Sequence, residues 1–265
     1  MKQLQELINK SWYGSVGYVK EIKNLYSLEH YIQTNLEVLK EFEGVVVATN
    51  YYDFDLAEQN RELWEMYLPD VMLIDNPVNR GHSFGTADLD NLLVRWCKEN
   101  DVQWLCKASN DVLITPETLE LMIPEADFYY TDGFSYQDLS NNHFDYSLMY
   151  GEHFFPQTNF YLIDVSKIDY LANEDYLNET YAYSQTIPNF NGKIWEHLPE
   201  WACENFLKGC VKRNDLVKHN MLDLKTYTKL CNVIEKHKVG DPSHKNIMIN
   251  GVCHFQFPTQ KIIKI

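Results

Sequence analysis

Segments that alternate between strand-like and helix-like patterns fill the first half of the chain, and they constrain the fold more than any other feature. Short apolar runs predict strands at residues 14–22, 45–48, 71–74 and 102–106. Between them, apolar residues recur at helical spacing over 28–42, 56–67 and 86–98. The Val-Val-Val-Ala run at 45–48 is typical of a strand buried on both faces. This alternation predicts an α/β fold, in which helices cover both faces of a mostly parallel, Rossmann-like sheet.

The second half of the chain is less regular. Strands are expected at 127–130, 159–165 and 252–257, and helices at 199–208 and 223–236, the first of them closed by Gly209. A further helix is expected to begin with Thr115 as N-cap and Pro116 as its first residue. Residues 133–156 resemble a long polar and aromatic loop. Residues 174–193 are rich in Tyr, Asn and Thr, and we expect this segment to order only on binding. Because the sequence shows no repeat and no linker, we expect one domain over 1–265.

Acidic residues outnumber basic ones by 38 to 23, and the formal net charge is −15. Nucleic acids and anionic membranes both attract basic surfaces, so neither is an expected partner. No apolar run approaches the roughly 20 residues of a transmembrane segment, and the polar start MKQLQELINK is unlike a signal peptide.

The cysteines form no CxxC pair, and most of them lie in apolar segments: 97, 106, 203, 210, 231 and 253. This pattern favours small buried hydrophobic residues in a reducing compartment over disulfides or a zinc site. We therefore expect a cytoplasmic protein.

A polar turn, Ser109-Asn110-Asp111, follows the strand expected at 102–106. Open α/β sheets bind ligands outside the carboxyl ends of their strands, where this turn would lie. A divalent cation that bridges phosphates needs few protein ligands, because water and phosphate oxygens complete its shell. Asp111 is therefore a candidate metal ligand. The alternative is that Asn110 and Asp111 only form the turn.

A glycine-containing loop at 79–85 leads into the helix expected from Thr86. Glycines let the backbone approach a ligand, a helix N-terminus favours anions, and Arg80 is able to meet a phosphate with two hydrogen bonds. The loop is thus a candidate phosphate site. The alternative is an ordinary connector in which Thr86 is the N-cap.

The order of three motifs is more specific than any one of them: VVVATNYYD, then NRGHSFGTADLDN, then KASNDVLITPETL. In this order they resemble the GT-A fold nucleotide-sugar glycosyltransferases, particularly the family 2-like enzymes. The resemblance covers about residues 12–132, which it implies to be the nucleotide-sugar-binding half, and leaves about 133–265 as the acceptor and catalytic half. Two positions depart from the family pattern: Ser109 replaces the first carboxylate of the metal motif, and Asn50 stands where an Asp is common.

The resemblance implies a set of site residues. It implies that Asp111 holds Mn²⁺ or Mg²⁺, and that the nucleotide sugar is bound by Asn50, Asp53, Asn79, Arg80, Gly81, Asp88 and Asn110.

The resemblance also implies a catalytic base and a second metal ligand in the second half. Glu200, in the segment IWEHLPEWACENFLKG, falls where the family carries its base, with Glu196 and Glu204 as rivals. A Glu in the first turn of a helix is also favoured by the helix dipole alone. His254 lies where the family often supplies a metal-binding histidine, with His244 as the fallback, although a histidine on a terminal strand needs no such role.

The resemblance therefore implies a metal-dependent glycosyltransferase, inverting by the family default, that moves a sugar from a nucleoside diphosphate to an acceptor hydroxyl. One alternative is a non-catalytic descendant that binds a glycan or a partner protein, since the first carboxylate is missing. A sugar nucleotidyltransferase is a weaker alternative, because the region after the first strand, Lys20-Glu21-Ile22-Lys23, has no glycine cluster.

Overall fold

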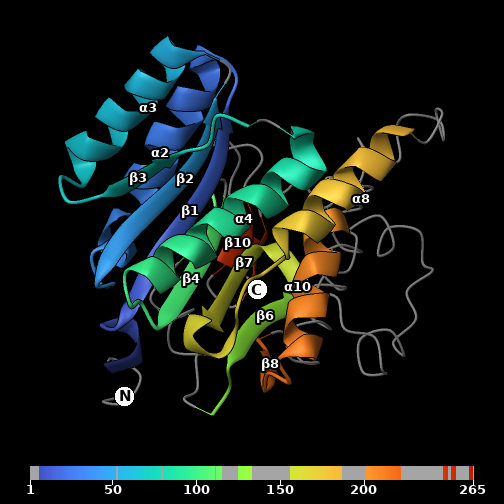
Figure 1. Ribbon diagram of the computed structural model, residues 1–265. Coiled ribbons are helices and arrows are strands. Elements are labelled where there is room, and N and C mark those ends of the chain that lie inside the picture. The colour runs from blue at the N-terminus through green and yellow to red at the C-terminus, as the bar shows by residue number, and fades with distance from the viewer. Residues whose placement is uncertain are drawn as a thin grey trace.

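The computed structural model describes residues 6–51, 53–78, 80–110, 112–114, 125–132, 156–186, 201–221, 247–249, 252–254 and 263–264. Its centre is a seven-stranded sheet with the order β3-β2-β1-β4-β7-β6-β8 (Figure 1). The strands are β1 (Ser11–Val19), β2 (Gly44–Tyr51), β3 (Met72–Asp75), β4 (Trp104–Ser109), β6 (Phe128–Asp132), β7 (Pro156–Asp164) and β8 (Lys218–Asn220). All neighbouring pairs are parallel except those of β7, which runs antiparallel to both β4 and β6. The predicted α/β fold with a mostly parallel sheet is confirmed.

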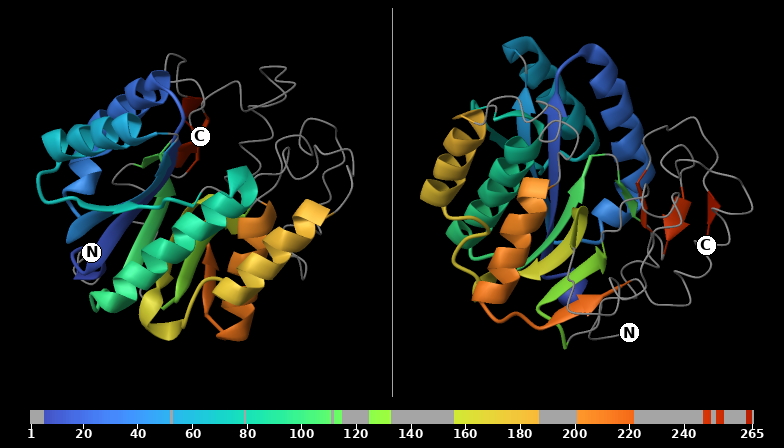
Figure 2. Two further views of the ribbon diagram at one scale, coloured as in Figure 1. Left: turned by 45° about the horizontal axis from the view of Figure 1, so that its top comes forward. Right: turned by 90° about the vertical axis from the view of Figure 1, so that its right-hand side faces the viewer.

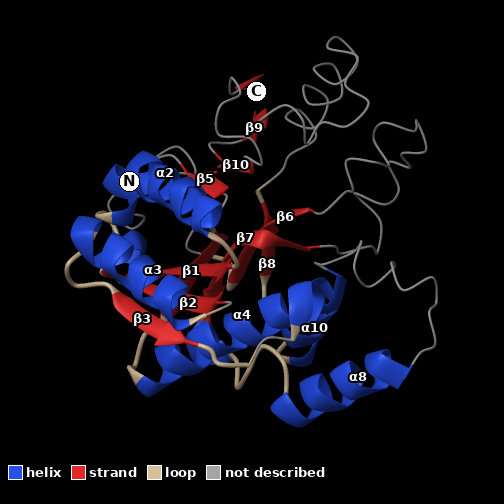
Figure 3. Ribbon diagram, turned by 90° about the horizontal axis from the view of Figure 1, so that it is seen from above, coloured by secondary structure: helices blue, strands red, loops and turns tan. Residues whose placement is uncertain are grey.

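Helices cover both faces of the sheet, as Figure 3 shows from above. They are α2 (Ile22–Leu39), α3 (Phe54–Tyr67), α4 (Gly81–Glu99), α8 (Glu174–Thr186) and α10 (Trp201–Arg213), with a short 3-10 turn η1 (Val165–Lys167) after β7. On one face, buried residues of α2 and α3 such as Ile32 and Trp64 pack on Val45 and Val47 of β2. On the other face, Leu93 of α4 packs on a core that includes Val46 and Leu105. Successive β2 residues thus serve opposite cores, which explains the continuous valine run.

A second, four-stranded sheet lies beside α2 (Figure 2). Its order is β11-β9-β10-β5, with β5 (Val112–Ile114), β9 (Ile247–Ile249), β10 (Val252–His254) and β11 (Ile263–Lys264). The strand β5 comes from the first half of the chain and the others from its end, so this small sheet joins the polar turn after β4 to the last residues of the protein.

Two predictions about α4 were wrong. The helix begins at Gly81 rather than at Thr86, and its N-cap is Arg80, so most of the predicted loop is helical. Phe84 and Ala87 are buried in a cluster with residues of α8 and α10. This packing overrides the low helix propensity of the two glycines, which had suggested a loop.

The second half departs from the sequence pattern in two places. Residues 174–186 form the helix α8, which the Tyr-, Asn- and Thr-rich pattern did not indicate, because Leu177 is buried in the same cluster and Tyr181 makes an edge contact with the ring of Phe84, 5.4 Å between centroids. The helix α10 continues past Gly209 to Arg213, since Cys210 and Val211 are buried against the sheet. Three expected segments lie outside the described residues: the helix starting at Thr115, the helix at 223–236, and the loop at 133–156 except for its last residue, which begins β7.

Candidate functional site

The strand order reverses between β1 and β4. The chain moves outward from β1 to β2 and β3, and then returns to place β4 on the other side of β1. At such a reversal the two neighbouring connections leave in opposite directions, and a crevice opens at the carboxyl ends of the strands. The residues that follow β1, β2, β3 and β4 at this edge are therefore the candidate site.

Asn110 packs directly on β1 at this reversal. Its backbone N–H donates to the carbonyl of Val16 at 3.1 Å. Its side chain lies over Gly17, where an added Cβ would come within 2.5 Å of Asn110 Nδ2. A side chain at position 17 would displace the Asn110 amide, so Gly17 lets the side chain of Asn110 lie on the end of β1. Half-buried Asn110 thus anchors the turn, a role that the sequence did not reveal.

Asn50, the second-to-last residue of β2, has a buried side chain. Its side chain is 2% exposed, and among the described residues none hydrogen-bonds to its Oδ1. The first turns of α4 reach it, since a Cβ on Gly85 would lie 3.4 Å from Asn50 Nδ2. A buried acceptor without a donor costs free energy, and such groups are concentrated at functional sites. Asn50 is thus placed to accept a hydrogen bond from a ligand.

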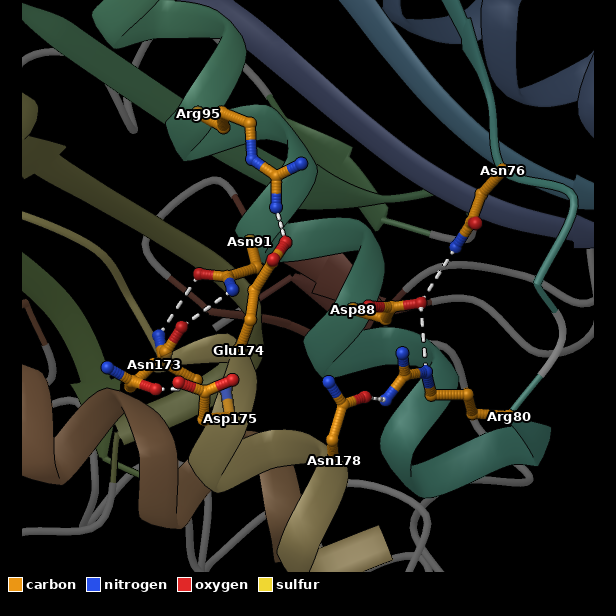
Figure 4. Close-up of polar contacts among 10 residues, drawn as sticks. Asn76, Arg80, Asp88, Asn91, Arg95, Asn173, Glu174, Asp175 and Asn178 are labelled. Atoms are coloured by element: carbon orange, nitrogen blue, oxygen red, sulfur yellow. Dashed lines mark hydrogen bonds and ion pairs between the residues drawn. The ribbon is translucent and has the colours of Figure 1, made fainter.

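Asp53 and Asp88, two further predicted binding residues, have partners within the protein. Asp53 is exposed and caps α3, accepting from the N–H of Leu56 at 2.9 Å. Asp88, on the second turn of α4, lies 3.5 Å from Arg80 Nε and accepts from Asn76 Nδ2 at 2.9 Å (Figure 4).

Arg80 joins α4 to α8 at the same edge. Its Nη1 donates to Asn178 Oδ1 of α8, and its guanidinium carbon lies 5.9 Å from the centre of the Tyr181 ring. The side chain is 18% exposed. The sequence suggested Arg80 from its loop, but it missed Asn76 and Asn178. Nothing in the local pattern marks these two, because the contact of Asn76 depends on how α4 packs beside the end of β3, and that of Asn178 on how α8 docks on α4.

The other predicted residues are placed only in part. Gly81 is the first residue of α4, and Glu204 lies within α10. Asn79, Asp111, Glu196, Glu200 and His244 lie outside the described residues.

His254, one of the two predicted metal ligands, lies on β10 of the small sheet. Strand β10 pairs antiparallel with β5, and the backbone of His254 stands opposite Val112. Asp111, the other predicted ligand, comes directly before Val112 in the sequence but lies outside the described residues. In the part of the chain that the structure describes, no three His, Cys, Asp or Glu side chains form a group able to hold a metal ion.

Described cysteines do not supply a nucleophile. Cys97, Cys106 and Cys210 are free and buried, as expected from the sequence. Burial raises the pKa of the Cys97 thiol to about 12 and that of Cys210 to about 11, and it also raises the pKa of Cys106. A thiolate is thus disfavoured at each position.

A groove of about 420 Å³ lies at the opposite edge of the sheet, between the end of α4 and the start of α8. Its charged lining residues include Arg95, which is paired with Glu174 (Figure 4). They also include Lys98, which donates to the carbonyl of Ile168. Since these charges already have partners, the groove offers less to a ligand than the carboxyl edge does.

None of the described helices is both long and apolar enough to cross a membrane. Neither a comparison with models of known protein families nor a search of curated proteins returns a match.

Proposed function

We propose that the protein is a metal-dependent glycosyltransferase that transfers a sugar, with inversion, from a nucleoside diphosphate sugar to an acceptor hydroxyl. One observation carries the proposal: the reversal of strand order between β1 and β4 gathers three features at one edge of the sheet. They are the buried Asn50 Oδ1, which accepts no hydrogen bond from the described residues, the α4 N-terminus with Arg80, and Ser109-Asn110 at the end of β4. Parallel sheets bind nucleotides at such a reversal. The order of the sequence motifs supports the same assignment.

The donor would lie across this edge. Asn50 would accept a hydrogen bond from the nucleoside, with Asp53 near it, and the N-terminus of α4 would face the phosphates together with Asn79, Arg80 and Gly81. Asp88 would hold Arg80 in place, because its carboxylate lies 3.5 Å from Arg80 Nε and is itself held by a hydrogen bond from Asn76 Nδ2.

Asp111 and His254 are the residues that would hold Mn²⁺ or Mg²⁺, helped by the diphosphate itself. Carboxylate and imidazole ligands suit Mn²⁺, and the pairing of β10 with β5 supports their proximity. A bound cation supplies neutralisation of the charge that develops on a leaving diphosphate. Glu200 would take the proton from the acceptor hydroxyl as its oxygen attacks the anomeric carbon.

Calorimetry with UDP-, GDP- and dTDP-hexoses in the presence of Mn²⁺ tests the proposal. We expect one of these donors to bind, and Asp111→Ala to weaken its binding by at least about 10-fold, since even residues behind metal ligands change affinity by that much. Asp70→Ala is the matched control, because Asp70 is an exposed aspartate before β3, at the other edge of the sheet. If no donor binds, or if Asp111→Ala binds as tightly as Asp70→Ala, the assignment is wrong.

A second candidate is a non-catalytic protein that binds a nucleotide sugar or a glycan. The replacement of the first metal-motif carboxylate by Ser109 favours it. Hydrolysis or transfer of a bound donor separates the two, since a binding protein would retain the donor intact.

A further inference from the structure

A fully buried ion pair lies next to the end of β4, whose last residue is Ser109. Lys107 of β4 and Asp90 of α4 are both 0% exposed, and Lys107 Nζ lies 3.3 Å from Asp90 Oδ1. The hydroxyl of Tyr161, on β7, donates to Asp90 Oδ2 at 3.0 Å. Lys107 Nζ also lies 5.6 Å from the centre of the Tyr161 ring. Three elements that meet under the candidate site therefore share one polar cluster.

The stability of the fold gives little reason to keep charges there. Transfer of each ion from water costs several kcal/mol, and apolar replacements of a buried pair are often equally or more stable. Leu89 and Leu93 of α4 and Leu105 of β4 belong to the hydrophobic core on this face of the sheet. Ordinary leucine or methionine packing would join α4 to β4 as well as the ions do, so the pair calls for another explanation.

The cluster is connected to the turn. Lys107 and Ser109 are two residues apart on β4, so their side chains face the same side of the sheet. Lys107 Nζ donates to Ser109 Oγ at 3.4 Å. On the other side of this short segment, Asn110 is bound to β1 through the carbonyl of Val16 and packs on Gly17. The two residues before Asp111 are thus held from two directions.

We propose that Asp90 and Lys107, with Tyr161, are positioning residues that fix Ser109 and Asn110, the two residues that precede the proposed metal ligand Asp111. This inference rests on the proposed function, which assigns Asp111 to the metal. The alternative is that the ion pair only attaches α4 to the sheet.

The decisive variant is the double replacement Asp90→Asn with Lys107→Met. It removes both charges at nearly constant volume, whereas either single change takes the ion-pair partner from a buried charge, at a cost of about 3–5 kcal/mol. The matched control is Arg95→Met with Glu174→Gln, which removes an exposed ion pair between α4 and the start of α8, at the far edge of the sheet.

The first measurement is amide hydrogen exchange of Asn110 by NMR, together with urea unfolding of the same samples. In the double variant we expect the Asn110 amide, which is bound to Val16, to exchange at least about 10-fold faster through local opening, while the midpoint of unfolding and the Cys106 amide change little. If the cluster only attaches α4, the double variant would instead lower the midpoint of urea unfolding, and the Asn110 amide would exchange no faster relative to wild type than the Cys106 amide does. That result would overturn the inference.

The second measurement is the affinity for Mn²⁺ in the presence of UDP or GDP, by electron paramagnetic resonance. We expect the double variant to bind Mn²⁺ about 10–100-fold more weakly than the wild type and the control, as for other groups that orient metal ligands. If the wild type binds and the double variant binds equally well, the inference alone is wrong. If the wild type itself binds no Mn²⁺ with any nucleotide, the proposed function is wrong, and the positioning role fails with it.

Discussion

Two buried asparagines of this protein have opposite hydrogen-bonding states. Asn35 of α2 accepts from the Ile114 N–H at 2.8 Å and donates to the carbonyls of Val112 and Tyr31 at 3.1 and 3.0 Å. Asn50, equally buried, has an Oδ1 that none of the described residues contacts by a hydrogen bond. A buried polar side chain that is hydrogen-bonded stabilises the fold. One without a hydrogen-bond partner costs free energy, and its presence is explained if a ligand supplies the partner.

Replacing each asparagine by leucine, which has a similar shape, separates these roles. Asn35→Leu leaves the Ile114 N–H and the Val112 carbonyl without their side-chain partner, so we expect a loss of about 2–4 kcal/mol of unfolding free energy. Asn50→Leu removes an acceptor that is already unpaired, so we expect a change of less than about 1 kcal/mol but clearly weaker binding of the donor. Urea unfolding followed by circular dichroism measures the first quantity and calorimetry the second. Equal destabilisation by both substitutions would contradict the ligand role of Asn50.

At the scale of elements, α8 is held on α4 by contacts of unequal strength (Figure 4). Asn91 of α4, 6% exposed, donates to the Ala172 carbonyl at 2.6 Å and accepts from the Ala172 N–H at 3.0 Å. The ion pair between Arg95 and Glu174 is exposed. Buried backbone groups must be paired, whereas an exposed ion pair contributes little.

We therefore expect Asn91→Ala to lower the unfolding free energy by about 2–4 kcal/mol, since both backbone groups of Ala172 lose their partner. Glu174→Ala serves as the control and should change it by no more than about 1 kcal/mol. Thermal unfolding of the two variants makes the comparison. Should Glu174→Ala prove the more damaging, the docking of α8 would depend on charge rather than on the buried asparagine.

The same two elements show where sequence reasoning succeeds and where it fails. Periodicity predicted the core-facing residues of α4, such as Leu89 and Leu93, because burial on one face is a local pattern. It failed at the start of α4 and for α8. There the helix depends on Phe84, Leu177 and Tyr181 meeting from distant parts of the chain, and such contacts override local propensity.

At the scale of the whole molecule, the candidate site is a product of topology. Asn50, Arg80, Asn110 and His254 belong to four different elements, and only the order β2-β1-β4 and the pairing of β10 with β5 bring their backbones to one region. The sequence predicted a parallel sheet, and with it the edge where ligands bind. It did not predict the strand order, the small sheet, or the ion pair of Asp90 with Lys107, since each depends on pairing between residues far apart in the chain.

A site assembled from so many elements should couple ligand binding to global stability. A ligand that binds only the folded state adds about 2.7 kcal/mol at 100 times its Kd, which raises the Tm of a domain of this size by roughly 5–10 °C. We expect this shift from the matching nucleoside diphosphate sugar with Mn²⁺, measured by calorimetry, and a smaller one when EDTA replaces the metal. The Tm of the Asp70→Ala control should rise on addition of the donor as much as that of the wild type. The Tm of Asp111→Ala with Mn²⁺ should rise only as much as that of the wild type with EDTA. A shift that EDTA leaves unchanged would mean that the donor binds without a metal, and the unpaired Asn50 acceptor and the α4 N-terminus would then account for binding without Asp111.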